Sequence, residues 1–156
     1  MADCKFETEI ELKTSPEKLW KNLKEFVTLF PKAMPDLIEG IDVIEGDGRS
    51  VGTVYVATFK PTEVSPVATI IKERLEIVDD EKKIWGYRVL EGDILENYKN
   101  FKVVIYVGSS PKSDGALIKY TAEFNKANEK VVVDHDILKA FAVQMYKNVD
   151  AYLRKL

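Results

Sequence analysis

The sequence predicts an α+β protein in which a seven-stranded, curved antiparallel sheet surrounds a long C-terminal helix. Two observations predict this arrangement. The chain reads in order as one strand, two short helices, six strands and one long helix. The strands alternate apolar and polar residues, whereas the last segment repeats apolar residues every three or four positions. A curved sheet need not close fully on its helix, so the same order also predicts an internal cavity.

The first elements are a strand and two short helices. Residues 6–12 alternate Phe, Thr, Ile and Leu with glutamates, which predicts a strand with one wet face. Ser15, Pro16 and Glu17 then supply an N-cap, a first-turn proline and an early acid, so a helix begins here. A second short helix is predicted at residues 27–33. Pro31 lies inside it, and the two helices are expected to form a V.

Six further strands are predicted at residues 38–45, 52–60, 67–79, 83–91, 98–107 and 116–124. The most distinctive connection is the segment 45–53, EGDGRSVGT, where Gly46, Gly48 and Gly52 indicate a backbone with positive φ. We expect a stiff hairpin turn there, with gating or contacting of a ligand as the alternative. A Walker loop is excluded, because a strand follows the glycines and the Gly-Lys-Ser/Thr sequence is absent.

Residues 134–156 are predicted to form the long amphipathic helix. Lys139, Lys147 and Asp150 lie off its apolar stripe. The residues of the stripe are Leu138, Phe141, Ala142, Met145, Val149 and Tyr152.

The start of this helix contains His135, the only histidine, between Asp134 and Asp136. Neighbouring helical residues diverge by about 100°, so these three side chains cannot all face one ion. An N-cap role for Asp134 and a favourable dipole interaction for Asp136 account for both acids. We therefore expect no metal and no other cofactor.

Composition and charge narrow the class of protein. The length of 156 residues predicts a single domain over 1–156, and 23 basic against 26 acidic residues without a basic cluster argue against nucleic acid. With Cys4 as the only cysteine, no intramolecular disulfide is expected. No signal-peptide pattern or apolar run of about 20 residues is present, so we expect a cytoplasmic monomer without integral membrane association.

Several segments, taken in order and spacing, resemble one plant family over essentially the whole chain. They are LFPKA at 29–33, EGDGRSVGT at 45–53, VDDEKK at 78–83, EGD at 91–93, YKNF at 98–101 and FNKANE at 124–129. The chain is similar to the major latex protein (MLP-like) family of the birch-pollen-allergen, or pathogenesis-related, superfamily. The resemblance implies a helix-grip (START-like) fold that encloses a large cavity for apolar or amphipathic small molecules. It also implies links to plant defence and stress.

The candidate ligand-binding residues come from the sheet and the last helix. Trp85, Tyr87 and Val89 share one strand face, and aromatic rings with polar tips suit a pocket that hydrogen-bonds one polar group. Tyr55, Phe59 and Arg74 match cavity positions of the family. From the helix we add Leu138, Phe141, Ala142 and Met145.

The sequence supports two different orientations of the strand that contains Arg74. Simple alternation would send Ile71, Leu75 and Ile77 inward instead of Arg74. Both orientations hold only if the strand carries a bulge.

The favoured function is binding, transport or storage of a hydrophobic small molecule such as a sterol, fatty acid, flavonoid or alkaloid-like compound. The alternative is an enzyme that uses acid–base catalysis in the same cavity for a condensation, cyclisation or isomerisation. Its candidate groups are Tyr87, Arg74 and Tyr120, although no full catalytic set aligns. Ribonuclease activity is disfavoured, because the chain has one histidine and an excess of acidic residues.

Overall fold

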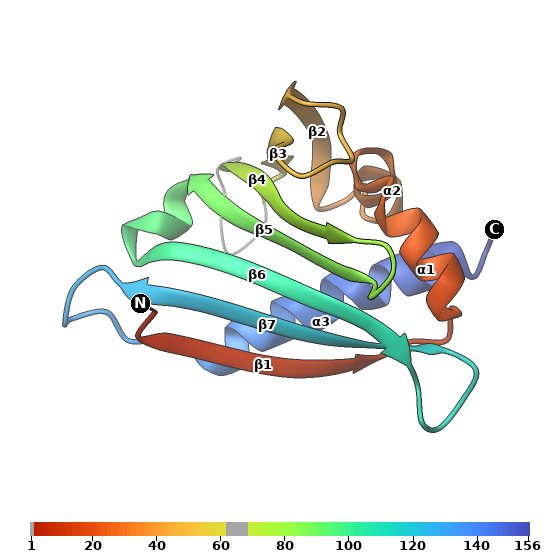
Figure 1. The fold of residues 1–156 in the computed structure, drawn as a ribbon. Coiled ribbons are helices and arrows are strands. Elements are labelled where there is room, and N and C mark those ends of the chain that lie inside the picture. The colour runs from red at the N-terminus through yellow and green to blue at the C-terminus, as the bar shows by residue number, and fades with distance from the viewer. Residues whose placement is uncertain (1, 62–68) are drawn as a thin grey trace.

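The computed structural model describes residues 2–61 and 69–156, and in these residues seven strands form one antiparallel sheet (Figure 1). The strand order across the sheet is β1-β7-β6-β5-β4-β3-β2, so β1 and β2 are the two edges. The strands are β1 (Cys4–Glu11), β2 (Ile38–Glu45), β3 (Val54–Phe59), β4 (Thr69–Asp79), β5 (Ile84–Glu91), β6 (Tyr98–Ser109) and β7 (Ala116–Lys126).

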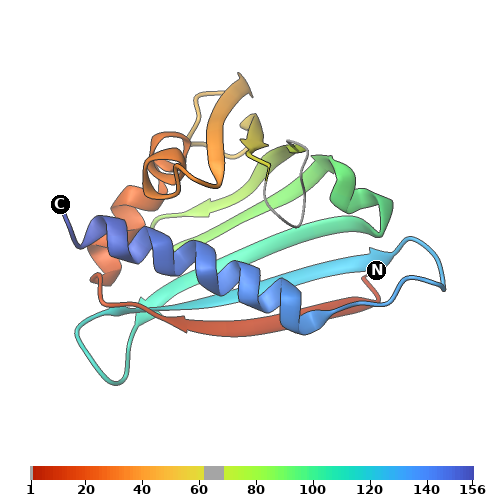
Figure 2. The same ribbon diagram turned by 180° about the vertical axis from the view of Figure 1, so that it is seen from behind.

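The helices lie together on one side of this sheet. They are α1 (Pro16–Leu23), α2 (Phe26–Ala33) and α3 (His135–Leu153), with a short 3₁₀ helix, η1 (Asp93–Glu96), before β6. Figure 2 shows α3 running across the inner face of the curved sheet, with α1 and α2 near its C-terminal end. The predicted α+β arrangement is therefore confirmed.

The helix starts follow the predicted chemistry. The Ser15 side chain accepts a hydrogen bond from Lys18 N at 3.3 Å, and Asp134 Oδ1 accepts one from Ile137 N at 3.0 Å. These contacts satisfy amide groups that a helix leaves without intrahelical partners. Pro31 lies within α2, as predicted.

The predicted strands agree with the observed ones to within about two residues at most ends. The strand predicted at 67–79 begins at Thr69 in the described residues, and its first two predicted positions lie outside them. The short helix η1 was not predicted.

Strand β4 contains one bulge of the kind that the sequence left open, at Glu76, and its partner β5 contains another, at Leu90. The pairing of β4 with β5 shifts register between Lys72 and Glu73 and again between Leu75 and Ile77. Leu75 is buried, whereas Ile77 is 38% exposed. Alternation was therefore right for Leu75 and wrong for Ile77, because the second irregularity reverses the facing of the strand.

The glycine-rich segment is a tight turn between β2 and β3. Gly46, Gly48 and Gly52 have φ of +90°, +83° and +95°, which confirms the predicted positive φ. The Asp47 carboxylate closes the turn by accepting hydrogen bonds from Ser50 N at 2.7 Å, Arg49 N at 2.8 Å and Ser50 Oγ at 2.8 Å. These bonds, led by the one from the Ser50 amide, lower the pKa of Asp47 to about 2.

Helix α3 is packed unevenly along its length. Its buried residues are Ala142, Tyr146, Val149, Asp150 and Leu153. Near its N-terminus, Ile137 is 65% exposed and Phe141 is 49% exposed. Ala142 and Val149 of the predicted stripe are buried, and Leu138, Met145 and Tyr152 are partly buried against the core, so the stripe agrees with the structure except at Phe141. The placement of Asp150 on the polar side was wrong.

Asp150 is buried because it binds the loop between β1 and α1. Its Oδ1 accepts hydrogen bonds from Thr14 N at 2.9 Å and Thr14 Oγ1 at 2.7 Å, and Lys13 N lies 3.2 Å from both carboxylate oxygens. Burial by itself would raise the pKa of Asp150, but the hydrogen bonds from Thr14 and Lys13 outweigh it and keep the pKa below its ordinary value. This carboxylate thus joins the last helix to the start of the chain.

In the portion of the chain that the structure describes, every helix is too short or too polar to cross a bilayer.

The Asp150 contact predicts a loss of stability in Asp150→Asn. The amide presents a donor to groups that are themselves donors, so we expect the free energy of unfolding to fall by about 1–3 kcal/mol. Because the folded pKa is lowered, the carboxylate stabilises the fold above its unfolded pKa, near 4, and loses this effect as the pH falls through the folded value. Urea unfolding at pH 7 and pH 3 measures the difference in the free energy of unfolding between the wild-type protein and Asp150→Asn. This difference should be smaller at pH 3. Asp114→Asn, in an exposed loop, is the control, and equal losses in both variants would contradict the assignment.

The turn geometry predicts a graded response to alanine. In Gly46→Ala a Cβ would meet Thr53 Cα at 2.9 Å in addition to the strain of φ +90°, whereas a Cβ on Gly52 meets nothing within 4 Å. We expect about 1–2 kcal/mol of strain for Gly52→Ala, more for Gly46→Ala, and almost no cost for Gly40→Ala, which has neither feature. Guanidinium unfolding curves of the three variants test the order. A Gly46→Ala variant as stable as Gly40→Ala would refute it.

Candidate binding cavity

A cavity of about 120 Å³ lies between the inner face of the sheet and the helices α2 and α3. Every strand of the described sheet contributes to its wall. The lining residues are Phe6, Phe26, Phe30, Ile38, Ile41, Tyr55, Ala57, Phe59, Ile71, Glu73, Tyr87, Val89, Ile94, Phe101, Tyr120, Leu138, Phe141, Met145 and Tyr146.

Seven of the candidate residues come together in this lining. They are Tyr55, Phe59, Tyr87 and Val89 on the sheet, with Leu138, Phe141 and Met145 on α3. Tyr87 and Phe141 therefore face one cavity from the sheet and from the helix. Phe141 also reaches the surface, since half of its side chain is exposed.

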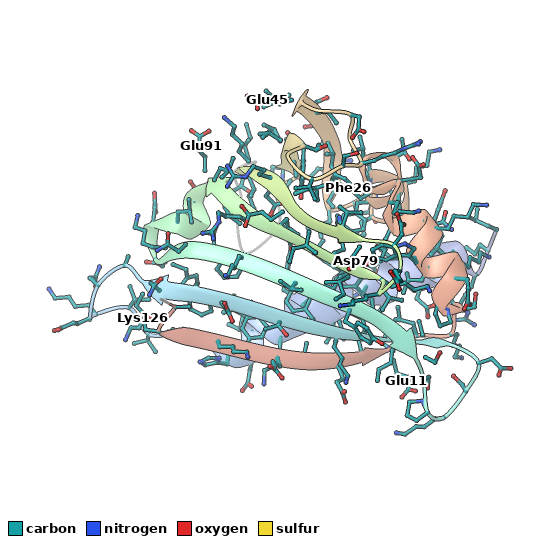
Figure 3. All side chains as sticks on the ribbon, viewed as in Figure 1. Glu11, Phe26, Glu45, Asp79, Glu91 and Lys126 are labelled. Carbon is teal, nitrogen blue, oxygen red and sulfur yellow. The ribbon has the colours of Figure 1, made fainter. Side chains whose placement is uncertain are left out.

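Trp85 shares its strand face with Tyr87 but lies outside the lining. Its ring packs against Phe26 and Phe30 of α2, with ring centroids 5.3 Å and 6.2 Å apart. Figure 3 shows Phe26 in the space between α2 and the sheet. The predicted facing of Trp85 was right, but α2 covers the indole and separates it from the cavity. Ala142 is likewise buried in helix packing and is not among the lining residues.

Arg74 lies on the outer face of the sheet, so the cavity position expected for it was wrong. Its Nη2 bonds Glu76 Oε2 at 2.8 Å, and Arg88 Nε bonds the other oxygen of Glu76 at 3.3 Å. These contacts, led by the hydrogen bond from Arg74, lower the pKa of Glu76. The inward position belongs to the preceding residue, Glu73, which the sequence analysis missed.

Other lining residues were missed although their sequence positions carried a signal. Phe6 alternates with the outward glutamates of β1, which already assigned it to the inner face. Tyr146 lies one turn after Ala142, a spacing that places both on one face of α3. Phe26 and Phe30 are also one turn apart, on α2.

Among the described lining residues, the polar groups are those of Glu73 and four tyrosines. The hydroxyl of Tyr55 donates a hydrogen bond to the Glu73 carboxylate, and the hydroxyls of Tyr87 and Tyr120 share another. Burial raises the pKa of Glu73 to about 7, and the bond from Tyr55 only partly offsets this rise. Burial and the charge of Glu73 raise the pKa of all four hydroxyls, including that of Tyr146. At neutral pH the tyrosines are therefore uncharged.

The glycine-rich turn contributes none of the described lining residues, so Gly46, Gly48 and Gly52 lie apart from the cavity. Among the residues that the structure describes, no three His, Cys, Asp or Glu side chains gather as metal ligands. The ring of His135 packs edge-on against Phe6, with centroids 6.3 Å apart.

The cavity has the chemistry of a small-molecule site, with an apolar wall and a few convergent polar groups. Its volume is below the roughly 300–1,000 Å³ common for ligand pockets and close to the roughly 150 Å³ cavity that accepts benzene in an engineered protein. A compound with one ring fits this space. A larger compound requires displacement of lining side chains, and Phe141 is the one that already reaches the surface.

Comparison with known proteins places this geometry in a family. The pathogenesis-related protein Bet v 1 family matches residues 1–156. MLP-like protein 423 of Arabidopsis thaliana is 40% identical over 147 residues, which cover 94% of this chain and 92% of that protein.

Solved structures show the same fold. The crystal structure of ginseng major latex-like protein 151 from Panax ginseng has a TM-score of 0.84 at 22% identity and covers 97% of this chain and 98% of its own. The crystal structure of Ara h 8.0201 has a TM-score of 0.82 at 21% identity, with 98% and 99% covered. The predicted helix-grip fold and the predicted resemblance are both confirmed. The chain belongs to the pathogenesis-related protein Bet v 1 family, as an MLP-like member.

Proposed function

We propose that this protein binds a hydrophobic or amphipathic small molecule in the cavity between the sheet and α3. The observation that carries the proposal is the part of the lining that the structure describes, which is aromatic and aliphatic apart from Glu73 and the tyrosine hydroxyls. Removing the apolar body of a ligand from water supplies about 25 cal/mol per Å² of buried surface, and the few polar groups fix its orientation. Transport or storage, with a place in plant defence, is the physiological role we propose for this binding.

An enzyme acting in the same cavity is the second candidate, and Glu73 is the observation that favours it. A general base works best when its pKa lies near the working pH, and the pKa of Glu73 is raised to about 7. Arg74, one of the earlier candidates, points away and takes no part. Turnover that is lost in Glu73→Gln while binding persists would assign catalysis to this cavity. We expect binding without turnover.

The proposed function predicts that an apolar dye can occupy the cavity. An apolar dye with a single ring system, fluorescent in apolar surroundings, should bind with about 1:1 stoichiometry and be displaced by other apolar compounds. Ala57→Leu adds volume to the lining and should weaken the dye at least several-fold, because the cavity holds only about 120 Å³. Ala151→Leu, on the exposed side of α3, is the matched control and should leave affinity unchanged. A dye that binds both variants equally well does not occupy this cavity.

Alanine substitutions should cost less stability in the wall of the cavity than in the core of the fold. Phe124 is fully buried and is not among the described lining residues, so Phe124→Ala should cost about 3–5 kcal/mol in the free energy of unfolding. Phe141→Ala should cost only about 1–2 kcal/mol, since half of that side chain is already exposed. It should also speed dye association, which stopped-flow fluorescence measures. Equal costs for the two variants would show that Phe141 belongs to the packed core.

A further inference from the structure

The carboxyl group of Glu73 is isolated from positive charge. Among the described residues that line the cavity, it is the only acidic side chain, and none of them is a lysine, arginine or histidine. The tyrosines that face it come from four elements, Tyr55 on β3, Tyr87 on β5, Tyr120 on β7 and Tyr146 on α3. All four are neutral hydrogen-bonding groups.

The nearest positively charged side chains along β4 form ion pairs with other acidic residues. Lys72 Nζ lies 3.1 Å from Glu91 Oε2, and the Arg74 guanidinium is paired with Glu76 on the outer face. Both flank Glu73 in sequence and so point to the opposite side of the strand. The cavity carboxylate therefore has no counter-charge among the described lining residues.

A buried carboxylate without a cation is unfavourable, because the surrounding apolar groups cannot replace its lost hydration. It is stabilised when a positive group enters the same low-dielectric space and bonds it directly. The ligand itself is the available source of that charge.

We infer that the cavity selects amphipathic amines, compounds with an apolar body and one protonated nitrogen that pairs with the Glu73 carboxylate. This inference rests on the proposed binding function and names the ligand class. The hydroxyl of Tyr55 donates to the same carboxylate and so helps to fix it. Tyrosine oxygens accept the remaining N–H bonds, and tyrosine ring faces attract the cation.

The same arrangement discriminates against anions. A ligand carboxylate placed among these hydroxyls would face Glu73 as a like charge in a poorly solvated site. Fatty-acid-like compounds should therefore bind in the opposite orientation or more weakly than amines of equal size.

The test uses three probes that share one ring and differ in the head group: 2-phenylethylamine, 2-phenylethanol and 3-phenylpropanoate. Isothermal titration of the wild-type protein at pH 8.5 should give at least tenfold tighter binding of the amine than of the alcohol, with the acid weakest. In Glu73→Gln the amine should lose this advantage, while the alcohol changes less than about threefold. Glu39→Gln, exposed on the edge strand β2, is the matched control and should retain the preference.

A pH series of the wild-type protein supplies a test that needs no variant. The amine, with a pKa near that of lysine, stays protonated from pH 5.5 to 8.5, whereas Glu73, with its pKa raised to about 7, ionises over this range. Affinity for the amine should rise about tenfold or more, and affinity for the alcohol should not rise.

The outcomes separate the two proposals. Equal affinities of amine and alcohol, or an amine affinity that stays flat or falls as the pH rises, would overturn the selection of amines while leaving cavity binding in place. Failure of all three probes and of the apolar dye to bind would overturn the proposed function itself.

Discussion

The buried carboxylate of Asp150 is the contact on which the arrangement of the cavity depends. It holds α3 to the loop after β1, and Lys18 Nζ adds a bond to the Leu153 carbonyl at 2.9 Å. Only the C-terminal half of α3 receives this support. The half that carries Phe141 and Leu138 spans the sheet without equivalent polar contacts in the described residues, and the cavity lies beneath it. The helix is thus anchored at one end and covers the binding space with the other.

The sheet contributes a second constraint, because its two faces carry different electrostatics. On the outer face of β4 and β5, charges are paired in water, as in the contact of Glu76 with Arg74 and Arg88. On the inner face the tyrosines are neutral and Glu73 has a raised pKa. Glu73 faces the cavity by simple alternation with Ile71 and Leu75, because β4 pairs regularly with β3 over residues 69–74. Among the described lining residues, this strand therefore supplies the only carboxyl group.

Local patterns in the sequence predicted the elements well, because strand alternation, N-caps and turn residues act over a few positions. The capping by Ser15 and Asp134 and the positive φ of the glycine turn are of this kind. The failures arose from contacts distant in sequence. Asp150 is buried only because its partner Thr14 lies 136 positions away, and Trp85 is hidden only because α2 packs on it. Arg74 is a different case, because alternation with Ile71 and Leu75 already favoured Glu73, whereas Arg74 was chosen from its match to the family.

The cavity therefore has a polar part whose side chains are held in place and an apolar part whose side chains can move. Glu73 and the tyrosines on the sheet sit on hydrogen-bonded strands, and bonds such as the one from Tyr55 restrict their side chains. Phe141 lies on the exposed stretch of α3, where fewer neighbours resist its movement. Because the cavity is small, a larger ligand body gains room only where the lining can move. It follows that the head group of a ligand is selected by the sheet, whereas the size of its body is limited by how far the N-terminal half of α3 and its side chains can be displaced.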